Sequence, residues 1–168
     1  MTDSVSITPE APPGWDEATV ERHGGHVYQS TAWAEHRRSS GWQPLFVSIG
    51  EARVLALSRS WPLVGGGSAY IPRGPAPTVP SDRLGEVLWA TTRALAADGI
   101  DVVAADPEVP ASDMTWASWL RRAGFHEIDE IQPSRHRLTL PLGEGATDET
   151  VLAGISKSTR QRIRKAER

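Results

Sequence analysis

The chain is 168 residues long, enough for one domain with its own core, and its 39% hydrophobic and 23% charged content is ordinary for a globular protein. It has no cysteine, which excludes disulfides, thiolate nucleophiles and cysteine-ligated zinc. No apolar run approaches the roughly 18 residues that a membrane span needs, and the acidic N-terminus is not a signal peptide. We therefore expect a cytoplasmic protein.

The net charge of −3 conceals an asymmetry. Residues 157–168 contain six basic residues and one acidic residue. Taking these from the totals of 18 basic and 21 acidic residues leaves 12 and 20 upstream, a net charge of −8. An acidic body with a basic end predicts an anionic partner at that end.

The first half of the chain predicts a disordered lead-in over residues 1–14, followed by short helices and strands. Ser30 or Thr31 is expected to cap the first clear helix. Alternating apolar residues predict a half-buried strand over 45–49, with a hairpin turn at Gly50-Glu51. The expected elements are a helix at 16–22, a strand at 26–29, a helix at 31–40, and strands at 45–49, 53–61 and 68–71.

The second half shows its clearest pattern in a helical stripe over 81–98, which Gly99 ends. A buried strand over 100–105 follows, and Ser112 or Asp113 then caps a second helix. Strands are expected at 126–131 and 135–142, and a last helix from Thr147 that still runs, uncapped, at Arg168. This order favours a mixed sheet flanked by helices, an α/β (α+β) fold. The uncapped end indicates that the chain stops before its fold is complete.

Common catalytic and metal motifs are absent: there is no Walker loop, GxGxxG or HExxH. His23 and His26 lack a carboxylate at ligand spacing, so no metal site is predicted. Asp106 follows the 100–105 strand, where it is either a functional carboxylate or the opening of a turn.

Two upstream arginines could bind an anion. Arg73 lies between two prolines that fix the backbone, and Gly74 lets another group approach closely, so the turn is either an anion site or a simple turn. Trp33 and Arg37 are one helical turn apart. They form either a ligand site or a core tryptophan beside a solvated arginine.

The last helix carries the strongest local signal, because Lys157, Arg160, Arg164 and Arg168 recur every three or four residues on one face. Like charges at this spacing repel by a few tenths of a kcal/mol per pair. Phosphate oxygens match the arginine fork and would relieve that repulsion. A solvated basic face, or a coiled-coil flank paired with acids, remains the alternative.

Several segments together resemble the Fem-type (FemABX) aminoacyltransferases, which build peptidoglycan cross-bridges. The matching segments are QSTAWAE at 29–35, GW at 41–42, YIPRGP at 70–75, DP at 106–107, GF at 124–125, IQPS at 131–134 and SKSTRQRIRKAE at 156–167. The resemblance implies a GNAT-like acyltransferase fold that occurs twice in the complete enzyme. Residues 15–145 would form the first copy, and residues 146–168 a basic helix leading to a missing second domain.

The implied reaction moves an amino acid from aminoacyl-tRNA to the stem peptide of a UDP-linked or lipid-linked peptidoglycan precursor. It requires no cofactor, metal or covalent intermediate, and peripheral association with the inner membrane face is compatible with it. Arg37 stands where the family commonly has a lysine, and Arg160 is the arginine of its K-[ST]-x-R motif. The implied substrate-binding residues are Arg37, Tyr70, Arg73, Lys157, Arg160 and Arg164.

Two other functions fit parts of the sequence. A non-catalytic nucleic-acid-binding module would rest on the basic end alone, and the acidic body disfavours it. A GNAT-like transferase acting on another cell-surface polymer fits the same motifs.

Overall fold

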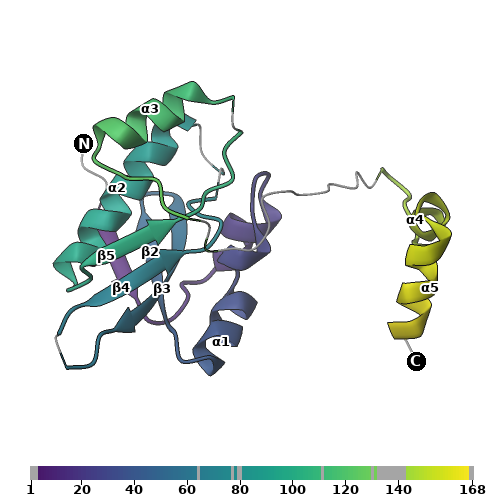
Figure 1. Cartoon of the computed structure of the whole chain (residues 1–168), viewed down its shortest axis with the longest axis horizontal. Helices are drawn as coiled ribbons and strands as arrows, with labels where there is room; N and C mark the ends of the chain where they lie inside the picture. The colour runs from purple at the N-terminus through teal and green to yellow at the C-terminus, as the bar shows by residue number, and fades with distance from the viewer. Residues whose placement is uncertain are drawn as a thin grey trace. The chain divides into compact units, whose positions relative to one another are not determined.

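The computed structural model describes residues 4–63, 65–76, 78, 81–110, 112–129, 131 and 143–166. The chain divides into two compact units, Met1–Asp129 and Glu130–Arg168. The first unit is an α/β domain, and the second contains two helices (Figure 1).

A five-stranded sheet in the order β1-β2-β3-β4-β5 forms the first unit (Figure 1). The first three pairings are antiparallel, whereas β4 and β5 run parallel. The carboxyl ends of β4 and β5 therefore lie at the same edge of the sheet. The strands are β1 (Val5–Thr8), β2 (Gln43–Ile49), β3 (Ala52–Ser60), β4 (Gly67–Ile71) and β5 (Val102–Ala105).

Helices cover both faces of this sheet. On one face, α2 (Ser81–Ala97) and α3 (Met114–Arg122) pack against residues such as Val47 and Val54. On the other, α1 (Thr31–Ser39) packs over Phe46 and Leu55 (Figure 1). Because both faces are covered, β2 is buried on both sides rather than half-buried as its alternation predicted. The predicted α2 stripe is confirmed, with Leu84, Val87, Leu88, Thr91 and Leu95 all at most 3% exposed.

The N-terminal segment corrects the prediction of a disordered lead-in. Val5–Thr8 forms β1 and pairs antiparallel with β2, from Val5 opposite Ile49 to Thr8 opposite Phe46. This segment is therefore ordered by backbone hydrogen bonds to the edge of β2, although its composition predicted no regular structure. The predicted helix at 16–22 is a π-helix over Glu17–Glu21, and the predicted strand at 26–29 is a 3-10 helix over Val27–Gln29.

Two strand predictions after α2 also need correction. The strand over 100–105 is shorter and not buried, because β5 is the edge of the sheet among the described residues, and Val102 is 51% exposed. Residues 126–129 and 131 form no strand. The strand predicted at 135–142 lies outside the described residues.

The second unit contains α4 (Asp148–Gly154) and α5 (Lys157–Ala166) instead of the single helix predicted from Thr147. Thr147 is the N-cap of α4 and accepts from the backbone N–H of Thr150, as a capping box requires. The backbone is extended at Ile155, and the Ser156 hydroxyl accepts from the backbone N–H of Thr159 at the start of α5. A new N-cap thus interrupts the predicted helix.

Candidate functional site

Arg73 lies at the shared carboxyl-end edge of β4 and β5, in the turn directly after β4. Its backbone N–H donates to Asp106 Oδ1 at 2.5 Å, and its Nε lies 3.6 Å from Asp106 Oδ2 and 3.8 Å from Glu108 Oε1. Asp106 and Glu108 follow β5. Because parallel strands end together, their following residues meet at one place, as at the ligand sites of open α/β sheets.

These contacts change the prediction that the turn presents a lone cation. Arg73 has an αL backbone, with φ +50°, and its side chain is only 19% exposed. Two carboxylates surround one guanidinium, so the group carries a net charge of −1 when His26 is neutral. Sequence reasoning considered Asp106 but missed Glu108, because an acid two residues after a strand has no distinctive pattern.

His26 joins this group to the helix on the neighbouring face. Its Nε2 lies 3.6 Å from Glu108 Oε1, and its Nδ1 accepts from the backbone N–H of Tyr28 at 2.9 Å. Since Nδ1 accepts, the neutral ring carries its proton on Nε2, facing the carboxylate. His26 therefore caps the 3-10 helix and contacts Glu108 with the same ring.

A run of aromatic and cationic side chains continues from His26 toward the end of α1. The His26 and Tyr28 rings meet edge to face at 5.0 Å, and Tyr28 stacks on Trp33 at 4.1 Å between centroids. The Arg37 guanidinium lies 5.7 Å from the Trp33 centroid. Contacts thus connect Arg73, through Glu108, to Arg37, so these two predicted residues belong to one continuous surface of the first unit.

Arg59 and Trp42 extend the run beyond Arg37. Trp42 lies 5.3 Å from the Arg37 guanidinium and 4.3 Å from that of Arg59, which also donates to the Ser40 carbonyl at 2.9 Å. The helical spacing predicted the pairing of Trp33 with Arg37. Arg59 was missed, because it comes from the end of β3 and only the folded sheet places it beside Trp42.

Two donors in this run lack hydrogen-bond partners: Trp33 Nε1 and Arg37 Nε are both buried and unsatisfied. Among the described residues, neither Arg37 nor Arg59 has a carboxylate within 4.0 Å. The surface is therefore acidic around Arg73 and basic around Arg37 and Arg59. Each of these two guanidinium groups lies beside the Trp42 ring, and neither is neutralised by a described carboxylate.

Tyr70 belongs to β4 itself rather than to the following loop. It lies opposite Leu57, a member of the core under α1, so its ring faces the same side of the sheet as the aromatic run. Tyr70 is 6% exposed. It forms part of the wall beneath this surface.

Gln29 is a further residue whose role the sequence did not indicate. It is completely buried, and its side-chain amide hydrogen-bonds to the backbone of Leu55 and of Pro72, directly before Arg73. Gly74 lies against the same amide, and a Cβ built there would be 2.6 Å from Gln29 Nε2. The sequence predicted that Gly74 leaves room for another group to approach closely. In the structure that group is the Gln29 amide rather than a ligand.

The remaining predicted residues lie on α5 in the second unit. Lys157 and Arg164 are exposed on that helix. The Arg160 Nη1 donates to the carbonyls of Leu152, Ala153 and Ile155 at 2.9, 3.2 and 2.6 Å. Arg160 thus binds the C-terminal carbonyls of α4, which carry the negative end of that helix dipole. The substrate-binding role that the resemblance implies for these three residues stays a prediction.

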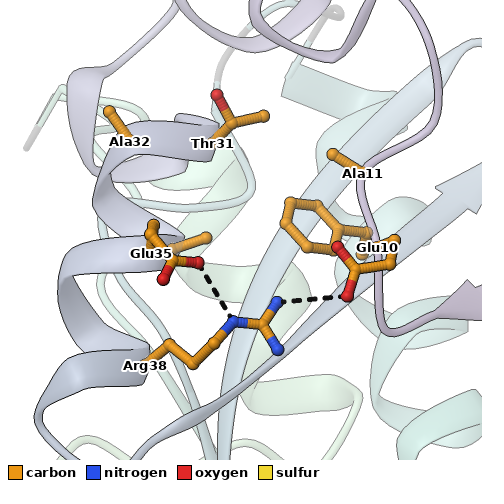
Figure 2. A pocket seen from close by; sticks show the side chains of 8 residues that line it. Glu10, Ala11, Thr31, Ala32, Glu35 and Arg38 are labelled. Carbon is orange, nitrogen blue, oxygen red and sulfur yellow. Dashed lines mark hydrogen bonds and ion pairs between the residues drawn. The ribbon is translucent and has the colours of Figure 1, made fainter.

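A pocket of about 360 Å³ lies between residues 10–11 and α1, over Phe46 (Figure 2). Arg38 crosses it, 3.7 Å from Glu10 and 3.2 Å from Glu35, so its charge is already paired. None of the predicted residues lines this pocket. Within the described ranges, no group of acids and histidines could hold a metal, and no helix is long and apolar enough to cross a membrane.

Comparisons with known proteins give a structural match but no sequence match. No protein-family model matches the chain, and no curated protein matches it significantly. The crystal structure of FemX aligns over 95% of this chain with a TM-score of 0.65 and 19% identity. The chain spans 42% of FemX.

Two further solved structures align less well. The Bacillus subtilis protein YycN, described as a candidate acetyltransferase, covers 81% of this chain and 100% of its own, with 14% identity and a TM-score of 0.41. The aminoglycoside 6'-N-acetyltransferase of Acinetobacter haemolyticus covers 80% and 99%, with 12% identity and a TM-score of 0.39. Only the FemX alignment is close enough to define the fold. The chain therefore has the mixed α/β, GNAT-like fold of the matched part of FemX, as its resemblance to Fem-type proteins implied.

Proposed function

We propose that this chain is the precursor-binding part of an acyltransferase that moves an amino acid from aminoacyl-tRNA to the stem peptide of a peptidoglycan precursor. The observation that carries the proposal is the run of contacts from Arg73 to Arg37, in which Arg73 belongs to the YIPRGP segment and Trp33 to the QSTAWAE segment that resemble Fem-type proteins. The FemX fold over 95% of the chain supports it.

The charges of this surface suit the two ends of such a precursor. Its diphosphate would lie beside Arg37 and Arg59, where no carboxylate of the described ranges lies within 4.0 Å and where Trp33 Nε1 and Arg37 Nε lack partners. Guanidinium groups bind phosphate through charge-assisted, paired hydrogen bonds. Lys157, Arg160 and Arg164 would add cations from the second unit, as the resemblance implies.

The acidic end would hold the amine of the stem peptide. An ammonium group beside Asp106 and Glu108 would replace part of their interaction with Arg73. After losing a proton, the amine attacks the ester carbonyl of aminoacyl-tRNA, a new amide bond forms, and the terminal ribose hydroxyl leaves carrying a proton. Positioning and charge stabilisation would supply the rate, so no nucleophilic side chain is required.

Titration of the 168-residue chain with UDP-linked precursor, followed by tryptophan fluorescence, tests this proposal. We expect saturable binding that Arg37→Ala weakens by about 1–3 kcal/mol, as for a charge-assisted hydrogen bond. Arg93→Ala, an exposed arginine on α2, is the matched control and should leave the affinity unchanged. Equal affinity for plain RNA, unaffected by Arg37→Ala, would instead favour the nucleic-acid-binding module.

A further inference from the structure

Gln29 occupies a position in the sheet that a strand would otherwise fill. The pairing of β3 with β4 extends from Ser60 opposite Gly67 to Leu57 opposite Tyr70, and β4 then ends at Ile71. Leu55 precedes Leu57 by two residues in β3 and therefore lies beyond the last residue pair of the β3–β4 ladder. Its backbone N–H and C=O are buried and need partners from elsewhere.

The Gln29 side chain supplies those partners. Its Oε1 accepts from Leu55 N at 2.8 Å, and its Nε2 donates to Leu55 O at 3.2 Å. The same Nε2 donates to Pro72 O at 2.7 Å. One amide thus satisfies both groups of Leu55, as a neighbouring strand would, and ties them to the residue directly before Arg73.

The backbone of Gln29 is also fixed by hydrogen bonds. Its backbone carbonyl accepts from Trp15 Nε1 at 2.8 Å and from the Thr19 hydroxyl at 3.1 Å, and its N–H donates to His26 O at 2.8 Å. Gly74 leaves no room for the amide to move toward the turn. A side chain so constrained fixes the position of Pro72, and with it the approach of Arg73 to Asp106.

We propose that Gln29 is a positioning residue for precursor binding: its amide sets the Arg73 turn at the acidic end of the binding surface. This inference rests on the proposed function for its ligand, but the geometry of the turn can be measured without one. Gln29 is fully buried and cannot touch a substrate itself, so its side chain acts on the site through Pro72 and Arg73.

The test uses Gln29→Glu, which keeps the shape of the side chain. An ionised carboxylate has no donor and would face the carbonyls of Leu55 and Pro72, whereas the protonated acid keeps one donor and one acceptor. Affinity for UDP-linked precursor is measured between pH 8 and pH 5 as the ratio to wild type. Gln29→Met, which adds no ionisable group, shows how much of any pH dependence comes from the site's own charged groups, His26, Asp106 and Glu108.

We expect the Gln29→Glu variant to bind about 10-fold more weakly at pH 8, and the difference to shrink as the pH falls and the introduced carboxylate is protonated. Gln29→Met, of similar volume but without hydrogen bonds, should bind weakly at every pH. Equal recovery of both variants, or a Gln29→Glu affinity equal to wild type at pH 8, would overturn the inference.

Amide hydrogen exchange of Leu55 and Arg73 separates this inference from the proposed function. In Gln29→Glu, the protection factor of the Arg73 amide should fall at pH 8 and recover at pH 5, whether or not the precursor binds, while the Leu55 amide, which keeps an acceptor in the carboxylate, serves as the reference. If wild type binds no precursor but this exchange pattern holds, the proposed function fails and the positioning of the turn stands. Unchanged Arg73 protection at pH 8 refutes the positioning role even if the precursor binds. Should Gln29→Glu unfold at pH 8, Gly74→Ala tests the same contact, because its methyl group displaces the amide, and Arg73 protection should then fall at every pH.

Discussion

Replacement of Gly74 by alanine tests the packing of the Arg73 turn with a single methyl group. The added Cβ would lie 2.6 Å from Gln29 Nε2 and 2.9 Å from Ile71 Cγ2, both closer than real Cβ atoms approach. Nε2 must therefore move by about 1 Å to reach ordinary van der Waals distance. That movement breaks its bond to Pro72 O at 2.7 Å and lengthens the bond to Leu55 O, already 3.2 Å.

The expected cost follows from these contacts. Overpacking of a tight site costs about 1–3 kcal/mol, and a buried carbonyl left without its partner costs about 1–3 kcal/mol. Restriction of the unfolded chain by alanine returns about 0.4–1 kcal/mol. The two costs overlap, because a shift that relieves the clash is the one that breaks the bond. We therefore expect a net loss of about 2–4 kcal/mol in the free energy of unfolding.

Urea denaturation followed by tryptophan fluorescence measures this loss. Gly143→Ala is the control, since a Cβ at Gly143 would meet no atom within 4 Å, and its effect should stay within about 0.5 kcal/mol. In a Gln29→Ala background the cost of Gly74→Ala should fall by at least about 1 kcal/mol, because the clashing amide is gone. A Gly74→Ala protein as stable as wild type would refute the geometry described for Gln29.

Three further predictions concern charged groups. Arg59→Ala should weaken precursor binding about 5- to 10-fold, less than Arg37→Ala, because Arg37 also has a buried unsatisfied donor; a titration with no change removes Arg59 from the site. Arg160→Met removes the nitrogen that donates to three carbonyls of α4 and its C-cap, so circular dichroism should show loss of α4 helicity, and native helicity would contradict that role. Hydrogen bonding to Thr147, then to its own backbone N–H, lowers the pKa of Glu149 from its usual value. A carboxylate whose pKa is lower in the folded than in the unfolded state stabilises the fold at pH values above its unfolded-state pKa. That stabilisation is lost as the pH falls through its folded-state pKa. Glu149→Gln should therefore reduce helicity at about pH 7 but not at about pH 2, and an equal effect at both would contradict the assignment.

The sequence predicted correctly those elements whose capping residues, turn residues and apolar periodicity all lie within the element itself. The stripe over α2, the Ser30 cap of α1 and the turn at Gly50 all lie where the sequence placed them. It failed at β1, a strand of four residues that exists only because β2 offers an open edge. It failed again between α4 and α5, where Gly154 at the end of α4 and the Ser156 cap of α5 are the only local signs of the break.

The candidate site was predictable in the same uneven way. Trp33 and Arg37 were paired from helical spacing, and the Arg73 turn from its prolines and glycine. The partners that define their electrostatics were not predictable, because Glu108 and Arg59 reach the site only through the pairing of β5 with β4 and of β3 with β2. Long-range pairing thus decides which end of the surface is acidic and which is basic.

The central claim is that the surface around Arg37 binds the diphosphate of the precursor, and indole N–H signals in NMR test it most directly. Seven tryptophans give seven such signals. On addition of UDP-linked precursor, we predict that the Trp33 and Trp42 signals shift in a saturable way, while that of Trp89 on α2 does not. Shifts confined to Trp89, or uniform across the protein, would contradict the claim.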